Sequence, residues 1–516
     1  MSYLHKHQQG LVICSTLVLF VVLAWCSIRH HEMWRDELGV WSITRDNSWS
    51  GIFQHARIGG HPALWFLAVK TIQLFTANPM GMQLLNLAFM AAAIWLMLQY
   101  APFTLYHKVL AAFSYYFFYE YTTICRDYGL GFFFLTVFLS LYRHRQHYAA
   151  WMGITLALMM NTHILFLLFA MMLAGYWISD MVITDHKAII NSFKSSKYLS
   201  ALGFIIVGMA LYYLHARPDP NFQFIQGKSI PASLASFQRY FVPAALPLIF
   251  KTIAPMPELK MEFWNTYLFS GKWSLPLSLA VIILLNISLV RLHKRRLALF
   301  YSIAVAGFLL FFSAIYFGYI RHHSFLYLIF FAVLWILGLE LEELSVHHIS
   351  APRRWVNLLN GRWSLLTLAC VVQFGAAIAA ISMDWKYPFS ANKQAVDYLI
   401  DNELDQELWV GDEDYIVAPI SAWTGKKIYY PVTGLWGSYV KWNAPRQNIG
   451  WLQKKDLERQ ERFIVAEAKR ISMDAKQAVI LILSYPVALQ PLAQFTLVIT
   501  NEKYYLYKID HTLSFN

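Results

Sequence analysis

Long apolar segments alternate with short polar loops along most of the chain. A transmembrane helix needs about 20 mostly apolar residues to cross a hydrocarbon core about 30 Å thick. Most runs reach or approach that length, and a few are short for a span. These apolar runs cover residues 10–28, 82–100, 108–120, 129–142, 149–161, 164–180, 197–214, 275–291, 298–317, 323–340 and 363–382. The pattern therefore predicts an α-helical polytopic membrane protein with about 11 transmembrane helices.

The basic residues in the loops predict how these helices are oriented. Lys and Arg gather in four loops that share one side, at residues 143–145, 187–197, 291–296 and 353–362. Because cytoplasmic loops are enriched in Lys and Arg, we expect these loops and the N-terminus in the cytoplasm and the C-terminus outside. Counting the short run 61–75 as a span would reverse this assignment, so we expect it to lie on the outer surface as an interfacial helix.

The overall composition agrees with a membrane protein. Of 516 residues, 58% are hydrophobic and 14% are charged, whereas soluble domains carry about 25% charged residues. The formal net charge of +12 resides largely in the short loops, so we expect no nucleic-acid partner. The first apolar run, 10–28, lacks a clear cleavage site and is read as a retained span rather than a signal peptide.

The chain changes character after Met383. Residues 384–516 mix polar and apolar positions, as in a soluble fold. The pattern predicts an amphipathic helix and several strands, the last two forming a hairpin. The helix is expected at 391–404, and the strands at 407–412, 478–485, 495–500 and 504–509. We therefore divide the chain into a transmembrane domain, 1–383, whose outer loop is 29–81, and a small extracytoplasmic α/β domain, 384–516.

An acidic pair follows the first apolar run directly. Asp36 and Glu37 lie just beyond the expected membrane boundary, next to Arg35. One interpretation is a solvated acid paired with Arg35. The other is a general base, because a carboxylate held rigidly beside cationic loops has the geometry and the tunable pKa that proton transfer needs.

Three arginines lie at span boundaries on the same expected side: Arg126, Arg321 and Arg217. A guanidinium group matches two phosphate oxygens at once, so these residues are candidates for binding an anionic headgroup. Each of them could instead pair with membrane lipids or with the nearby acids Glu120 and Asp127.

The histidines of the outer loops do not form a recognisable zinc motif. His61 precedes a proline, His163 lies in a short turn, and His322 follows Arg321. No HExxH pattern is present, so a dedicated zinc site is not expected. A loosely held Mg²⁺ or Mn²⁺ between Asp36 and a lipid phosphate stays open.

The order of these motifs resembles the type C membrane glycosyltransferases, in particular the protein O-mannosyltransferase and aminoarabinose–lipid A transferase branch. The resemblance rests on Asp36-Glu37, on His61-Pro62, on Arg126-Asp127-Tyr128 and on the stretch "RHHSFLYLI" from Arg321. It covers roughly residues 10–340 and, more loosely, the C-terminal domain. Two positions depart from the family pattern: Asp127 stands where an apolar residue is common, and His322 stands in place of Tyr.

The resemblance implies transfer of a sugar from a polyprenyl-phosphate donor to an acceptor hydroxyl, with inversion at the anomeric carbon. Asp36 would deprotonate the hydroxyl, and Glu37 would tune Asp36 or bind a metal. Asp127 would be a second metal ligand beside Asp36 or simply a partner of Arg126. The donor phosphate would bind to Arg126, Arg321, His322 and Arg217, and the substrate pocket would include His61, Glu120, Asp127, Tyr128 and His163.

Other functions remain open at this point. A flippase for lipid-linked sugars would use the same cations, but it would also need polar residues through the membrane interior. An O-antigen-ligase type of enzyme would rely on late-loop Arg and His rather than on Asp36, and a non-catalytic scaffold would leave the outer cluster unexplained. We expect a transferase in a bacterial inner membrane, whose acceptor is a glycan, a lipid or a protein.

Overall fold

A computed structural model describes most of the chain, in two compact units. The described residues are 2–59, 61–184, 196–216, 230–346, 353–361, 364–412, 414–441 and 457–510, so Arg217 lies outside them. Unit 1 comprises the described residues of Met1–Ser27, Asn86–Arg217 and Gly227–Ser382. Unit 2 comprises the described residues of Ile28–Leu85 and Met383–Asn516. The expected outer loop 29–81 therefore groups with the C-terminal segment, while the predicted division at residue 383 stays a prediction.

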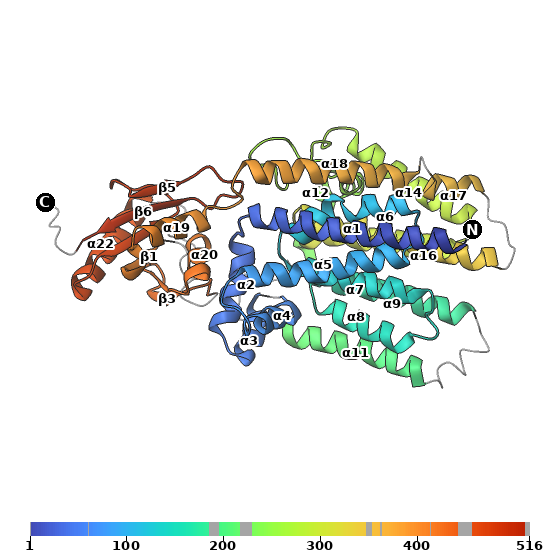
Figure 1. The fold of residues 1–516 in the computed structure, drawn as a ribbon, viewed down its shortest axis with the longest axis horizontal. Helices are drawn as coiled ribbons and strands as arrows, with labels where there is room; N and C mark the ends of the chain where they lie inside the picture. The colour runs from blue at the N-terminus through green and yellow to red at the C-terminus, as the bar shows by residue number, and fades with distance from the viewer. Residues whose placement is uncertain are drawn as a thin grey trace. The chain divides into compact units, whose positions relative to one another are not determined.

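The regular secondary structure in the described residues of unit 1 is entirely helical (Figure 1). Its helices, including those that continue into unit 2, are α1 (Ser2–His30), α5 (Met80–Tyr100), α6 (Leu105–Ala112), α7 (Asp127–Tyr142), α8 (Ala149–Met160), α9 (Ile164–Thr184), α11 (Ser196–Ala216), α12 (Ile230–Tyr240), α13 (Leu248–Ile253), α14 (Ser274–Arg291), α15 (Arg295–Leu310), α16 (Ile320–Val346), α17 (Arg353–Asn360) and α18 (Leu365–Lys386). Three π-helical segments join them: η1 (Tyr115–Thr123), η3 (Phe241–Ala245) and η4 (Phe311–Ile315).

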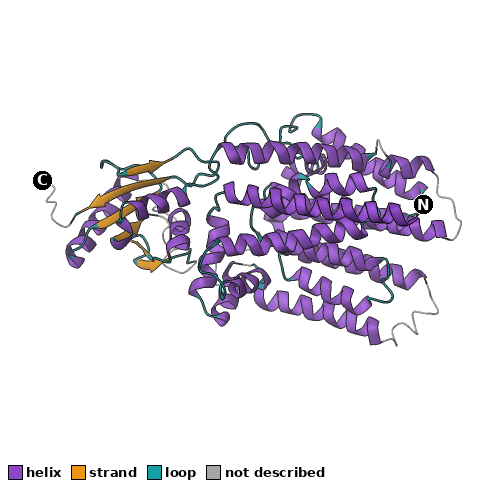
Figure 2. Ribbon diagram, viewed as in Figure 1, coloured by secondary structure: helices purple, strands orange, loops and turns teal. Residues whose placement is uncertain are grey.

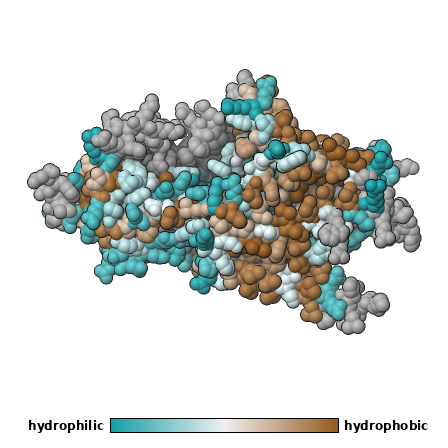
Figure 3. Space-filling view, turned by 90° about the horizontal axis from the view of Figure 1, so that it is seen from above, coloured by the Kyte–Doolittle hydropathy of each residue, from teal (hydrophilic) through white to brown (hydrophobic). Residues whose placement is uncertain are grey.

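Eight helices in the described part of the chain are long and apolar enough to cross a membrane. They match eight of the eleven predicted runs, and hydrophobic residues gather over the surface of unit 1 (Figure 3). The other three runs form shorter elements. The run 108–120 is interrupted because α6 ends at Ala112 and the Ser114 hydroxyl accepts the Phe117 amide at the start of η1. The count of eleven spans therefore stays a prediction.

Helices α8 and α11 pack closely because both carry glycine where they meet. A Cβ atom on Gly153 would lie 2.6 Å from the Ala201 backbone, and one on Gly208 would lie 2.6 Å from Ala157. Small residues at such contacts let helix backbones approach each other, which is the usual basis of helix association in lipid.

Unit 2 combines three short helices from the first loop with a mixed sheet (Figure 2). Its helical elements are α2 (Arg35–Asp46), α3 (Trp49–Gly59), α4 (Leu64–Ile72), α19 (Asn392–Asp401), η5 (Leu404–Gln406), α20 (Asp414–Thr424) and α22 (Leu457–Ala475). Its strands are β1 (Leu408–Gly411), β2 (Ile428–Tyr430), β3 (Leu435–Gly437), β4 (Val479–Leu483), β5 (Ala493–Phe495) and β6 (Tyr504–Ile509). The strand order is β3-β2-β1-β4-β6-β5, with β1 parallel to both β2 and β4.

Alternation along the central strands separates two hydrophobic layers. In β1, Trp409 belongs to the layer formed with α19 and α20, whereas Val410 belongs to the layer formed with α22. The sheet is thus covered by helices on both faces, which confirms the small α/β fold expected for the C-terminal segment.

Two predicted elements differ in extent from those in the structure. The strand predicted at 495–500 was wrong in its position, because β5 is Ala493–Phe495. Beyond it, the amides of Ile499 and Thr500 donate to the carbonyls of Pro388 and Phe389 instead of pairing within the sheet. The run 61–75 forms the nine-residue helix α4, too short to span a membrane, and its position on the outer surface stays a prediction.

Candidate functional site

Asp36 lies in the first turn of α2, in unit 2, and is half-buried. Free amide groups and the helix dipole make the N-terminus of a helix favourable for negative charge. The neighbouring Glu37 is fully buried. Its Oε2 accepts a hydrogen bond from the Trp34 amide at 3.1 Å and lies 3.2 Å from His31 Nε2. Glu37 thus holds the turn on which Asp36 lies.

His31 is clamped between two buried carboxylates. Its Nδ1 lies 2.8 Å from Asp384 Oδ2, and its Nε2 lies 3.2 Å from Glu37 Oε2. Burial by itself would lower the pKa of His31, but Asp384 and Glu37 outweigh burial and raise the pKa to about 10. His31 is therefore an imidazolium near neutral pH, and it donates to both carboxylates.

Arg35 connects α2 to the loop before β6. Its amide donates to Glu502 Oε1 at 3.0 Å, and its guanidinium Nε lies 3.7 Å from the same oxygen. The guanidinium also lies over the ring of Tyr415, 4.1 Å from the ring centre. Arg35 therefore pairs with Glu502 in the C-terminal segment.

Unit 1 gathers a second group of predicted residues around η1 and the start of α16. The π-helix η1 is entirely buried, and π-helical segments occur frequently at functional sites. Glu120 in η1 accepts hydrogen bonds from the Tyr115 hydroxyl at 3.2 Å and from Trp264 Nε1 at 3.4 Å. The Arg321 guanidinium lies 5.2 Å from the centre of the same Trp264 ring.

His163 belongs to this group as a neutral imidazole. Burial, together with the positive charges of Arg126 and Arg321, lowers its pKa to about 3. Its Nδ1 accepts the Leu165 amide at 3.2 Å, so its Nε2 carries the proton and donates to the Tyr128 hydroxyl at 3.3 Å. Both arginines therefore lie near one uncharged, hydrogen-bonded histidine.

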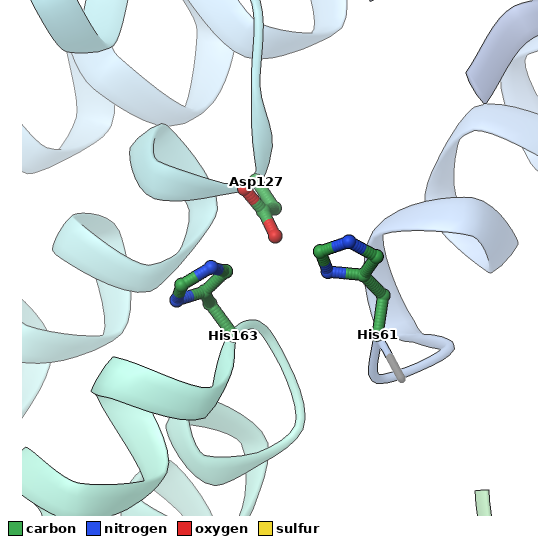
Figure 4. Close-up of side chains that lie close together, drawn as sticks. All are labelled: His61, Asp127 and His163. Atoms are coloured by element: carbon green, nitrogen blue, oxygen red, sulfur yellow. The ribbon is translucent and has the colours of Figure 1, made fainter. Parts of the chain in front are cut away.

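Asp127 and His322 complete the group. One carboxylate oxygen of Asp127 and one ring nitrogen of His163 lie within 4.8 Å of each other (Figure 4). The His322 ring lies 6.0 Å from that of His163, and its Nδ1 accepts the Tyr319 amide at 2.9 Å. Because Nδ1 already accepts this hydrogen bond, Nε2 is the ring nitrogen of His322 that could bind a ligand.

The structure thus divides the predicted site residues between the units. Unit 1 brings together seven of them: Glu120, Arg126, Asp127, Tyr128, His163, Arg321 and His322. Asp36, Glu37 and the exposed His61, which precedes α4, belong to unit 2. Sequence reasoning missed Trp264 and Glu502, because neither lies in a motif with recognisable spacing.

No protein-family model and no curated protein matches the sequence. Comparison with solved structures finds ArnT from Cupriavidus metallidurans bound to undecaprenyl phosphate, with a TM-score of 0.53 and 13% sequence identity over 97% of each chain. The fold is that of ArnT. The apo structure of the same transferase aligns with a TM-score of 0.45 and 14% identity over 95% of this chain and 97% of ArnT.

ArnT is the aminoarabinose–lipid A transferase, a type C glycosyltransferase. The resemblance to this branch is therefore confirmed for the fold, over nearly the whole chain. At this level of identity the likeness concerns the fold alone, and the roles of individual residues are a matter for proposal.

Proposed function

We propose that the chain is an inverting glycosyltransferase that moves a sugar from a polyprenyl-phosphate donor to an acceptor hydroxyl at the outer face of a bacterial inner membrane. The observation that carries the proposal is the group of Arg126, Arg321 and neutral His163 in an ArnT-like fold. The ArnT structure contains undecaprenyl phosphate, which has the lipid and phosphate chemistry that such a group suits.

In this proposal, Arg126 and Arg321 bind the donor phosphate. Arg321 is 5% exposed, and the attraction between a guanidinium and a phosphate is stronger where water is excluded. The Trp264 ring beside it offers an apolar and polarisable face. A phosphate monoester anchored by guanidinium groups can leave without a strong general acid, because its negative charge is already stabilised.

Asp36 is proposed as the general base. Its carboxylate would take the proton of the acceptor hydroxyl while the hydroxyl oxygen attacks the anomeric carbon. The bond from that carbon to the phosphate oxygen would break, and its electron pair would leave with the polyprenyl phosphate. A single in-line displacement inverts the anomeric centre.

A divalent cation would fit this chemistry through oxygen ligands. Mg²⁺ is commonly held by one or two carboxylates together with substrate phosphates. Asp127 offers such a carboxylate, whereas both ring nitrogens of His163 already take part in hydrogen bonds. Asp127 would therefore hold Mg²⁺ or Mn²⁺, which would neutralise part of the phosphate charge, and His163 would orient its neighbours.

The test uses purified wild type and Asp36→Asn, with a panel of undecaprenyl-phosphate sugars and a crude membrane extract as acceptor. The readout is undecaprenyl phosphate released, with and without chelator. Loss of a general base costs about 10²- to 10⁴-fold in rate. Asp397→Asn is the matched control, because Asp397 is an exposed carboxylate of unit 2 that pairs with Lys393.

Each outcome distinguishes the alternatives. Equal release by wild type and Asp36→Asn would refute Asp36 as the base. Transport of a labelled donor across the membrane of vesicles without release would indicate a flippase. Release of undecaprenyl diphosphate from an undecaprenyl-diphosphate-linked glycan, given as a separate donor, would indicate a ligase-type enzyme. Loss of release on chelation would show that a metal takes part.

A further inference from the structure

We propose that Glu502 is a positioning residue for Asp36: its carboxylate fixes the first turn of α2, on which Asp36 lies. This inference rests on the proposed function, because it gives the C-terminal α/β segment a role in the reaction. All the residues concerned belong to unit 2.

Both carboxylate oxygens of Glu502 are used. Oε1 accepts the Arg35 amide at 3.0 Å, and Oε2 accepts the Ser390 hydroxyl at 2.6 Å. The side chain is fully buried. The first amides of a helix have no partner within the helix, so a carboxylate that accepts the Arg35 amide sets the orientation of the first turn. Asp36 is the next residue along the chain.

Glu502 itself is held firmly. The preceding Thr500 donates to the Phe389 carbonyl through its amide at 3.0 Å and through its hydroxyl at 2.8 Å. After Glu502, the chain enters β6 at Tyr504, and β6 pairs with β4 in the centre of the sheet. The bond from Glu502 to Arg35 therefore links a rigid sheet to the turn that carries the proposed base.

Other contacts from the same segment hold the loop before α2. Asn392 Nδ2 donates to the Met33 carbonyl at 2.6 Å, and Gln394 Nε2 donates to Glu32 at 3.0 Å. These contacts lie further from Asp36 along the chain than the Arg35 amide does. Removing Glu502 should consequently loosen the first turn of α2 while leaving the loop attached, which distinguishes positioning from a general role in folding.

The experiment compares Glu502→Ala, Glu502→Gln and a matched control. Glu461→Ala is the control, because Glu461 also accepts a backbone amide, that of Ala488 at 2.8 Å, but on α22. Two quantities are measured on the full-length protein: hydrogen exchange of the amides at 31–38, and kcat and KM for release of undecaprenyl phosphate from an undecaprenyl-phosphate sugar.

We expect Glu502→Ala to speed exchange at 31–38 and to lower kcat by about 100-fold, as a displacement of about 1 Å of a reacting group does. The donor KM should stay unchanged, because the proposed phosphate ligands Arg126 and Arg321 belong to unit 1. Glu502→Gln keeps an oxygen acceptor for the Arg35 amide and should restore most of kcat.

Unchanged exchange at 31–38 in Glu502→Ala would overturn the proposal, and so would a kcat like that of Glu461→Ala. If Glu502→Ala does not fold, Ser390→Ala removes the second bond of the carboxylate, together with the two bonds that Asn392 donates to the Ser390 hydroxyl. It leaves the bond from the Arg35 amide to Glu502 in place and should give a milder form of the same two changes. No release by the wild type from any donor would refute the transferase and the positioning role together. Faster exchange in the variant would then report a purely structural contact.

Discussion

Replacing His31 by Gln should remove one specific part of the pH dependence of stability. His31 is held between Asp384 and Glu37. Burial lowers its pKa, but these two carboxylates outweigh burial and raise the pKa to about 10, from about 6.5 in the unfolded chain. A group whose pKa is higher in the folded than in the unfolded state stabilises the folded state. The full stabilisation is present at pH values below the pKa of the unfolded state. That contribution is lost as the pH rises from 6.5 through 10.

The magnitude follows from the width of this window. One pKa unit corresponds to about 1.4 kcal/mol, so raising the pH from about 7.5 to about 9.5 should remove about 3 kcal/mol of stability in the wild type. Burial raises the pKa of Glu32 and of Glu502 to about 7, from about 4.5. Their contributions to stability are lost as the pH rises from about 4.5 to about 7, below the pH range in which the contribution of His31 is tested.

The assay is thermal unfolding of the purified protein in detergent, recorded across this alkaline range. The wild-type midpoint should fall by several degrees as the pH rises, whereas the midpoint of His31→Gln should be lower at about pH 7.5 and change much less. His30→Gln is the matched control, because the adjacent His30 is exposed. The same pH dependence in His31→Gln and in the wild type would refute the reasoning.

Two further predictions concern unit 1. Arg321→Lys should weaken binding of undecaprenyl phosphate by about 10-fold or more, because an ammonium group cannot make the paired hydrogen bonds of a guanidinium. Arg143→Lys is the control, because Arg143 forms an exposed ion pair with Glu342, and equal weakening in both variants would contradict a specific role of Arg321. Gly153→Ala should lower the unfolding midpoint by an amount equivalent to about 1–3 kcal/mol, because its Cβ would lie 2.6 Å from the Ala201 backbone. Gly203→Ala, whose Cβ meets nothing within 4 Å, should leave the midpoint unchanged, and equal losses in both variants would contradict the packing argument.

Local pattern in the sequence was enough to predict most of the helical architecture. Eight predicted runs are helices of spanning length, because a span depends only on a continuous stretch of apolar residues. The run 108–120 failed this rule because Ser114 caps a new π-helix in the middle of an apolar stretch. Strands 408–411 and 479–483 were also predicted, since both are short, apolar and rich in aliphatic residues.

Motif order pointed to the candidate residues, but it could not say which of them lie together. Asp127 and His163 look unrelated in the sequence, and only the packing of α7 against the turn before α9 brings them together. The sequence suggested that Glu37 tunes Asp36 or binds a metal, and the structure shows it buried against His31 and the Trp34 amide.

By itself, the sequence determined the class of protein, the main helices and the residue types in the loops between them, because these depend on composition and short-range periodicity. Tertiary structure alone decided what surrounds Asp36. His31 meets Asp384 across 353 residues, and the Arg35 amide meets Glu502 across 467 residues. Buried charged groups are stable only when they are paired. Folding brings their partners together from distant parts of the chain, so a local sequence pattern cannot predict them.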